Sequence, residues 1–273
     1  MDKKGYDESK VTNNLRKIKH KILVLSGKGG VGKSTVSANL AVTLSEKGFK
    51  VGILDIDIHG PSIPKMLGVE DKRPGESETG FNPVNYSPKL KVMSMGFLLK
   101  DKDSPIIWRG PLKMTAIKQL IGDFNWGNLD YLIVDIPPGT GDEPLSIAQL
   151  IPNCDGAIIV TTPQDVALVS VRKSINFVKT MNMPVVGIIE NMSGFKCPHC
   201  GESIDIFKTG GGLKASKDFN VPFLGKVPLD SNIVETGDSG YPFVIKNKSS
   251  DTAKAFEKGV KNIEKIVNKK KEN

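Results

Sequence analysis

The stretch Gly27-Lys28-Gly29-Gly30-Val31-Gly32-Lys33-Ser34-Thr35 decides the fold. It follows a short apolar run, residues 22–25, and precedes a helical pattern over residues 34–47, so it satisfies G-x-x-x-x-G-K-[ST] between a strand and a helix. Glycines let the backbone close around a phosphate with its N–H groups pointing inward, and the following helix presents the positive end of its dipole to the anion. The sequence therefore predicts a phosphate-binding loop, with all nine residues in contact with a nucleotide.

The spacing within this loop assigns a task to three side chains. Lys33 is expected to pair with the β- and γ-phosphates, Ser34 to ligate Mg²⁺, and Thr35 to contact the α-phosphate. The alternative is a bare glycine-rich turn, which the strand and helix on either side disfavour.

Apolar runs alternate with helical patterns along the rest of the chain. The expected strands are residues 22–25, 51–55, 90–93, 131–135, 157–161, 185–189 and 223–227, and the expected helices between them are 34–47, 112–124, 144–151 and 166–181. This alternation predicts an α/β fold: a doubly wound, mostly parallel sheet of about seven or eight strands with helices on both faces. Residues 70–88 are rich in Gly, Pro, Ser and Asn, and we expect them to form a long loop over the sheet.

Length and composition indicate one main domain. The chain has 273 residues, of which 25% are charged and 38% hydrophobic, which is typical of a globular protein. We expect a basic N-terminal extension, residues 1–20, and then a single ATPase domain, residues 21–273, that includes the Cys-x-x-Cys segment at 197–200. A C-terminal amphipathic helix should close the domain, with an apolar stripe made of Ala253, Phe256, Val260, Ile263 and Val267. Packing of this stripe on its own domain is favoured over attachment to an anionic membrane.

The formal net charge of +8 lies at the two ends of the chain. Residues 1–21 carry seven Lys/Arg against three Asp/Glu, and residues 246–273 carry nine against four, so the body between them is nearly neutral. A neutral body offers no basic stripe to a duplex, and we expect no nucleic-acid partner. Because the chain has neither an apolar run of 18 residues nor a secretory signal pattern, we expect a cytoplasmic protein without membrane contact.

Three aspartates end two of the apolar runs. Asp135 ends the run 131–135 and precedes the flexible turn IPPGTG at 136–141, whereas Asp55 and Asp57 lie two residues apart at the end of the run 51–55. A nucleotide hydrolase needs a carboxylate near its magnesium ion and a group that orients water. We expect Asp135 to act on magnesium, and one of Asp55 and Asp57 to orient water while the other supports the magnesium shell. Simple capping of strand ends is the alternative.

A second lysine, Lys28, marks the deviant phosphate loop K-G-G-x-G-K-[ST] of the MinD/ParA-like ATPases, which is matched from Lys28 to Ser34. Within that group the chain resembles the Mrp/ApbC family of iron-sulfur cluster carrier ATPases over about residues 20–245. The resemblance rests on SGKGGVGKST at 26–35, DIDIHGPS at 55–62, WRGP at 108–111, DIPPGTGD at 135–142, TPQD at 162–165, ENMS at 190–193 and CPHC at 197–200.

The resemblance implies a slow, Mg-dependent ATPase that works as a homodimer, in which Lys28 of one subunit reaches the nucleotide of the other. It implies catalytic roles for Lys28, Lys33 and Asp57, and magnesium contacts from Ser34, Asp55 and Asp135. Adenine contacts are implied at Asn191, Pro228 and Asp230. The role of Arg109 stays open among phosphate contact, subunit contact and local fold.

Two of the three cysteines, Cys197 and Cys200, are spaced as metal ligands, whereas Cys154 is expected to be a small buried residue. A tetrahedral zinc ion or a [4Fe-4S] cluster generally takes four protein ligands, and one Cys-x-x-Cys supplies two. A dimer would supply four across its twofold axis. For this cysteine pair, a [4Fe-4S] cluster that bridges two subunits is the favoured hypothesis. Bridging zinc, a redox dithiol and a structural pair are the alternatives.

Together with these residues, the resemblance implies an ATP-hydrolysing carrier that holds a [4Fe-4S] cluster between two subunits and transfers it to apo-proteins after loading by a scaffold or donor. The alternative is a MinD/ParA-like positioning ATPase on a membrane or nucleoid, with zinc or nothing at the cysteine pair. Electron transfer by a stably held cluster, as in the relatives of nitrogenase reductase, is a third hypothesis.

Overall fold

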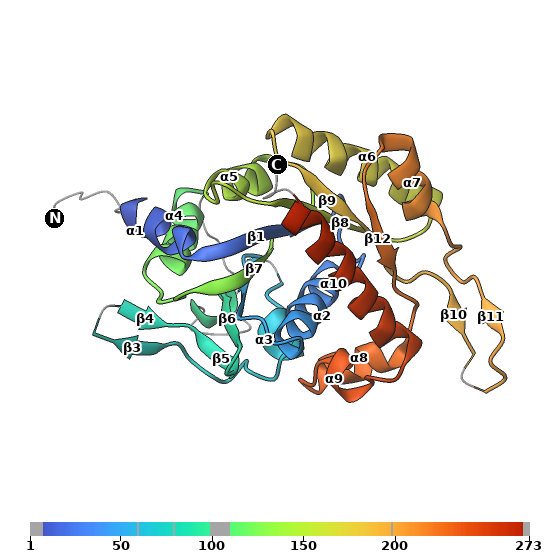
Figure 1. The fold of residues 1–273 in the computed structure, drawn as a ribbon, viewed down its shortest axis with the longest axis horizontal. Helices are drawn as coiled ribbons and strands as arrows, with labels where there is room; N and C mark the ends of the chain where they lie inside the picture. The colour runs from blue at the N-terminus through green and yellow to red at the C-terminus, as the bar shows by residue number, and fades with distance from the viewer. Residues whose placement is uncertain (1–7, 59, 79, 99–109, 198, 270–273) are drawn as a thin grey trace.

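The computed structural model describes residues 8–58, 60–78, 80–98, 110–197 and 199–269. Its main sheet has eight strands in the order β12-β9-β8-β1-β7-β2-β6-β5 (Figure 1). In chain order these strands are β1 (Ile18–Leu25), β2 (Val51–Asp55), β5 (Val84–Ser87), β6 (Leu90–Ser94), β7 (Leu129–Asp135), β8 (Gly156–Thr161), β9 (Val185–Glu190) and β12 (Phe223–Lys226). All neighbours pair in parallel except β5, which runs antiparallel to β6.

The helices lie on both sides of this sheet, which confirms the predicted doubly wound α/β fold (Figure 1). They are α1 (Glu8–Arg16), α2 (Lys33–Glu46), α3 (Ile63–Met66), α4 (Gly110–Gly122), α5 (Asp142–Gln149), α6 (Asp165–Thr180), α7 (Gly211–Phe219), α8 (Ser231–Asp238), α9 (Phe243–Lys246) and α10 (Asp251–Lys269), with a 3₁₀ turn, η1 (Met95–Leu98). One group packs around α2 and α10, and the other contains α1, α4, α5, α6 and α7. Helices bury both faces of the central strands, so β8 is almost wholly apolar and the second half of β1, residues 22–25, is apolar throughout.

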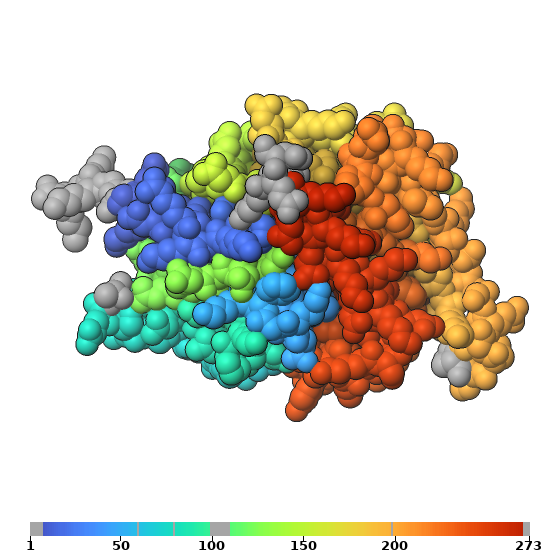
Figure 2. All heavy atoms as spheres, viewed as in Figure 1, coloured from blue at the N-terminus to red at the C-terminus, as the bar shows by residue number. Residues whose placement is uncertain are grey.

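The C-terminal helix α10 packs on its own domain, as the favoured interpretation predicted. The five residues of its apolar stripe are buried, and the helix contacts α2, β9 and β12. Figure 2 shows α10 lying across one face of the molecule. Within the described ranges, the search for a helix long and apolar enough to span a membrane finds none.

The segment 70–88 is not the long loop that its composition predicted. It contains a small antiparallel pair, β3 (Gly75–Ser77) with β4 (Gly80–Asn82), and then the edge strand β5. Strands of three or four residues carry too little periodicity to be read from sequence, and β5 is held by pairing with β6.

The N-terminal part of the chain also packs against the domain. Helix α1 lies on α4, and its Val11 and Leu15 are buried. Asn14 donates through Nδ2 to three carbonyl oxygens at the C-terminal end of α4 and just beyond it, at distances of 2.9–3.0 Å. Strand β1 then begins at Ile18, before the lower boundary expected for the domain.

Candidate functional site

The phosphate loop runs from the C-terminal end of β1 into the first turn of α2. Gly30 and Gly32 have φ angles of 77° and 78°, a left-handed conformation that glycine adopts without strain. Gly27 lies so close to α6 that a Cβ atom there would be 2.5 Å from the carbonyl oxygen of Ser170. The loop therefore has the backbone form that its motif predicted, and α6 packs directly against it.

Lys33 and Ser34 meet the carboxylate of Asp135 beside this loop. Lys33 Nζ and Ser34 Oγ each lie 2.6 Å from Asp135 Oδ2, and Ser37 Oγ donates to the other carboxylate oxygen, also over 2.6 Å. Asp135 is fully buried, and Lys33 is the only cation paired with it in the described part of the chain. The strand end therefore presents a hydrogen-bonded carboxylate to the loop, where the sequence predicted it.

The other two aspartates lie next to this pair. Asp55 is opposite Asp135 in the register of β2 and β7, and its carboxylate accepts hydrogen bonds from Ser94 Oγ and the Asp57 backbone N–H. Strand β2 ends at Asp55, but the Asp57 side chain still lies 3.9 Å from Lys33 Nζ. Three carboxylates thus surround the lysine of the phosphate loop.

Two of these carboxylates are buried side by side, and this changes the acidity of one of them. Burial, together with the nearby charge of Asp135, raises the pKa of Asp55 from 3.8 to about 8. A buried carboxylate pair with a serine hydroxyl 2.6 Å away is a set of hard oxygen donors, which is what Mg²⁺ prefers. Ser34, Asp55 and Asp135 therefore fit a magnesium ion.

The raised pKa gives a testable dependence of stability on pH. Between about pH 4 and 8 folded Asp55 holds a proton that the unfolded chain has lost, so this group lowers the free energy of unfolding as the pH rises, by about 1.4 kcal/mol per pH unit. Asp55→Asn mimics the protonated form, and we expect it to lose this slope and to exceed wild type in stability at pH 8. Urea unfolding at several pH values without nucleotide or magnesium measures this, with the exposed Asp218→Asn as the matched control. Equal slopes in wild type and Asp55→Asn would contradict it.

Lys28 lies half-buried in the phosphate loop, and its carbonyl oxygen accepts a hydrogen bond from Ser26 Oγ over 2.9 Å. Within the ranges that the structure describes, its ammonium group forms no ion pair. The first turns of α6, which packs on the loop, expose Val166 and Val169, whose side chains are 78% and 60% accessible. The start of α6 thus presents two exposed apolar side chains.

The three expected adenine contacts lie at the ends of β9 and β12. Asn191 is buried and donates through Nδ2 to the Val31 carbonyl of the phosphate loop over 2.9 Å. Pro228 directly follows Val227, whose N–H donates to the Glu190 carbonyl, so the ends of the two strands adjoin. Asp230 caps α8 through the Asn232 N–H, and its second oxygen accepts from Thr252. Asn191 thus touches the phosphate loop and Asp230 caps α8, and the contact of all three residues with adenine stays a prediction. Arg109 lies outside the described residues.

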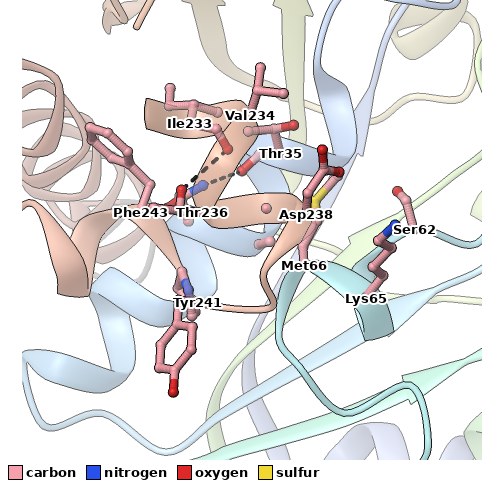
Figure 3. Close-up of a pocket in the computed structure, with 14 residues that line it drawn as sticks. Thr35, Ser62, Lys65, Met66, Ile233, Val234, Thr236, Asp238, Tyr241 and Phe243 are labelled. Carbon is pink, nitrogen blue, oxygen red and sulfur yellow. Dashed lines mark hydrogen bonds between the residues drawn. The ribbon is translucent and has the colours of Figure 1, made fainter. Parts of the chain in front are cut away.

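A cavity of about 260 Å³ opens beside the start of α2, between α3 and α8 (Figure 3). Its walls are mostly apolar, with Met66, Ile233 and Phe243 among them, and Thr35 and Lys65 add polar groups. Since Thr35 belongs to the phosphate loop as well, this cavity adjoins the nucleotide site. Apolar walls with a few polar groups are typical of a small-molecule site.

The cysteine pair lies on a hairpin formed by β10 (Phe195–Lys196) and β11 (Ser203–Ile204), which extends from the edge of the molecule (Figure 1). Cys200 is exposed and Cys197 half-buried, and hydrogen bonds from the backbone of Cys200 and His199 and from the Cys200 side chain lower the pKa of Cys197. Cys154 instead lies just before the amino-terminal end of β8, next to β1 in the middle of the sheet. Its thiol lies 3.0 Å from the Lys21 carbonyl oxygen, and burial raises its pKa to about 11. Among the described residues no group of three or more His, Cys, Asp or Glu could hold a metal ion. At this hairpin one chain therefore offers two thiols as possible ligands.

Sequence reasoning missed three polar residues of the site. Ser37 follows Lys33 by one helical turn, so helical spacing could have revealed its contact with Asp135. Ser94 bonds to Asp55 because β6 pairs with β2 in register, and Glu190 is a buried acid whose partners come from later in the chain. The contacts of Ser94 and Glu190 do not follow from local spacing, because their partners lie far away in the sequence.

Comparison with known proteins gives consistent matches over nearly the whole chain. The profile of the ParA family described as NUBPL iron-transfer P-loop NTPase matches residues 17–264. The iron-sulfur cluster carrier protein of Methanocaldococcus jannaschii is 53% identical over 264 residues, covering 96% of this chain and 90% of the relative. The cytosolic Fe-S cluster assembly factor CFD1 of Kluyveromyces lactis is 55% identical over 228 residues, covering 81% of each.

Solved structures agree. A nucleotide-binding protein of Archaeoglobus fulgidus in complex with ADP superposes with a TM-score of 0.80 at 38% identity, covering 92% of this chain and 98% of the other. The cell division ATPase MinD of Pyrococcus furiosus, at 24% identity and a TM-score of 0.62 over 90% of this chain and 99% of its own, shares the fold. The phosphate loop with its carboxylates, the fold and the match over residues 17–264 lead to one conclusion: this chain belongs to the NUBPL iron-transfer P-loop NTPase family.

Proposed function

We propose that this chain binds and slowly hydrolyses Mg-ATP and carries a [4Fe-4S] cluster, held between two subunits, to apo-proteins. One observation carries the proposal: an accessible thiol pair lies on a hairpin whose base adjoins the residue that contacts the phosphate loop. The named carriers and assembly factors among the relatives support the choice of cargo.

The residues around the loop divide the work on the nucleotide. Lys33 would leave Asp135 for the β- and γ-phosphates, the loop N–H groups and Thr35 would bind the remaining phosphate oxygens, and Asn191 and Pro228 would border the base. Ser34, Asp55 and Asp135 would hold a magnesium ion, which would supply positive charge to the phosphates. Asp57, which is only partly buried and 3.9 Å from Lys33 Nζ, would orient the attacking water.

A homodimer would complete both sites. Lys28, which has no ion pair within the described ranges, belongs to the phosphate loop, and α6 packs on that loop and exposes two valines, so a second subunit there would bring its own Lys28 to this nucleotide. The same twofold arrangement would bring two copies of Cys197 and Cys200 together and supply four thiolates.

The exposed hairpin fits a cluster that is delivered as cargo. Ligands on a projecting hairpin leave the cluster accessible to an apo-protein and to the scaffold or donor that loads it. Since relatives are named cytosolic Fe-S cluster assembly factors, we place this activity in the cytoplasm. The competing hypothesis of a positioning ATPase used the basic C-terminal helix as an attachment, and the apolar stripe of that helix is buried.

Anaerobic reconstitution with iron and sulfide tests the cargo. We expect about four irons per dimer with visible absorption in wild type. Two subunits together supply the four thiolates that one [4Fe-4S] cluster takes, so each dimer would hold one cluster. The Cys197→Ala/Cys200→Ala variant should bind none, and Cys154→Ala should match wild type, since Cys154 precedes β8 whereas the hairpin follows the carboxyl end of the parallel strand β9. Iron that persists in the double variant, or zinc retained in place of iron by wild type, would contradict the cluster.

A further inference from the structure

The two chain segments that carry the cysteine hairpin meet at one buried carboxylate, Glu190. On the outgoing segment, the Ser193 hydroxyl donates to Glu190 Oε1. On the returning segment, the Gly210 N–H donates to the same oxygen over 2.9 Å and the Gly212 N–H donates to Oε2 over 2.5 Å. Glu190 is fully buried at the end of β9, so its carboxylate closes the base of the hairpin away from water.

The partners of this carboxylate that the structure describes are all hydrogen-bond donors. Within the described ranges Glu190 forms no ion pair with a lysine, arginine or histidine, and its charge faces the N–H groups at the start of α7. A buried carboxylate held by donors alone depends on the geometry of all of them, because each lost bond leaves part of the charge unsatisfied. The three bonds therefore tie the two segments to one carboxylate.

The next residue in the chain contacts the phosphate loop. Asn191 Nδ2 donates to the Val31 carbonyl oxygen, and the side chain lies so close to Gly32 that a Cβ atom on Gly32 would be 2.3 Å from Nδ2. The Asn191 N–H in turn donates to the Thr161 carbonyl oxygen at the end of β8. One peptide unit thus separates a contact with the phosphate loop from the carboxylate that closes the hairpin.

Residues 192–194 form the turn that connects Asn191 to the cysteine hairpin, and this turn has little freedom to absorb a displacement. Met192 has a φ of 56°, a left-handed backbone conformation that is uncommon for a residue other than glycine, and Gly194 has a φ of 75°. The Ser193 N–H and the Gly194 carbonyl oxygen both bond to the segment after β12, so the turn is held on that side as well. A shift of Asn191 is therefore passed to Glu190 and Ser193.

We propose that Glu190 is a positioning residue through which occupancy of the phosphate loop sets the placement of the cysteine hairpin. A phosphate that enters the loop binds to the backbone around Val31 and Gly32, which Asn191 contacts, and Glu190 carries the resulting shift to the hairpin base. The proposal rests on the cysteine pair being the cargo site, but its test requires no cargo.

A merely structural role makes a different prediction. If Glu190 only caps α7, its replacement lowers stability and leaves any effect of nucleotide on the hairpin intact. If it positions the hairpin, the replacement removes that effect while the nucleotide still binds. The two roles are separated by measuring the response to nucleotide rather than activity.

The experiment compares alkylation of Cys197 and Cys200 in the cluster-free, reduced full-length protein, with and without a magnesium complex of a non-hydrolysable ATP analogue. Peptide mass spectrometry follows each thiol at one pH. In wild type we expect the analogue to change the alkylation rate about fivefold, a usual size for coupling between two sites. In Glu190→Gln we expect the ratio of the two rates to approach one, with the affinity for the analogue unchanged.

Glu202→Gln is the matched control, because it removes the same charge from an exposed position on the hairpin itself, and it should keep the wild-type ratio. A wild-type ratio of one, or a full ratio in Glu190→Gln, would overturn the proposal. If Glu190→Gln does not fold, Ser193→Ala removes one of the three bonds and should reduce the ratio; a full ratio there counts equally against it. The two proposals can fail separately. If iron binding does not depend on the cysteines but the ratio of alkylation rates still depends on Glu190, the proposed iron-sulfur cargo is wrong and the coupling between the phosphate loop and the hairpin stands.

Discussion

Replacing Lys33 with alanine should lower the rate of ATP hydrolysis by about a hundredfold or more. The ammonium group lies 2.6 Å from Asp135 and 3.9 Å from Asp57, so it places a positive charge beside the carboxylates around which the γ-phosphate would be transferred. Removing a group that stabilises developing charge in a preorganised site typically costs this much in turnover. Phosphate release by the full chain at saturating Mg-ATP measures the effect.

The same change should also destabilise the nucleotide-free protein, by about 3 kcal/mol, because it leaves the buried carboxylate of Asp135 without its cation. Lys173→Ala is the matched control: it removes a lysine from an exposed position on α6, and both turnover and stability should stay at the wild-type level. Hydrolysis by Lys33→Ala at the wild-type rate would show that this loop is not the site of hydrolysis.

Lys28→Ala should lower the rate of hydrolysis by about a thousandfold, comparable to the loss of a charge that one protein supplies to another's phosphoryl transfer. Lys28 has no ion pair within the described ranges, so we expect its loss to leave the fold and the nucleotide affinity of the monomer nearly unchanged. Nucleotide binding and thermal unfolding should therefore match wild type while turnover falls.

Mixing two inactive variants tests whether Lys28 acts across the subunit interface. In a mixed dimer, the site of the Lys28→Ala subunit has its own Lys33 and receives Lys28 from the Lys33→Ala partner. Such a mixture should regain about a quarter of wild-type activity, because half of the dimers are mixed and each has one complete site. An inactive mixture, with dimer exchange shown separately, would place Lys28 in its own subunit's site.

The pairing of strands decides how residues far apart in the sequence meet, and a prediction from local sequence patterns does not include that pairing. Asp55 and Asp135 were both expected near magnesium, and they lie opposite each other because β2 pairs with β7. The pKa of Asp55 could not be predicted from its motif, since it depends on burial and on the charge of Asp135, which lies 80 residues further along the chain. The short strands of segment 70–88 were missed for the same reason: pairing with β6 holds β5 more than its own residues do.

The phosphate loop was readable because nine consecutive residues carry everything it needs: glycines for the left-handed turns, a lysine, and hydroxyls at the start of a helix. Local backbone preference and the helix dipole act between near neighbours, so the motif specifies its own shape. The link from this loop to the cysteines became visible only in the tertiary structure. Glu190 receives its donors from positions 193, 210 and 212, and Asn191 reaches back to Val31, because β9 ends beside the phosphate loop and α7 begins at the same edge of the sheet. Burial and hydrogen bonding between distant segments depend on how the whole sheet is ordered, and no local pattern encodes that order.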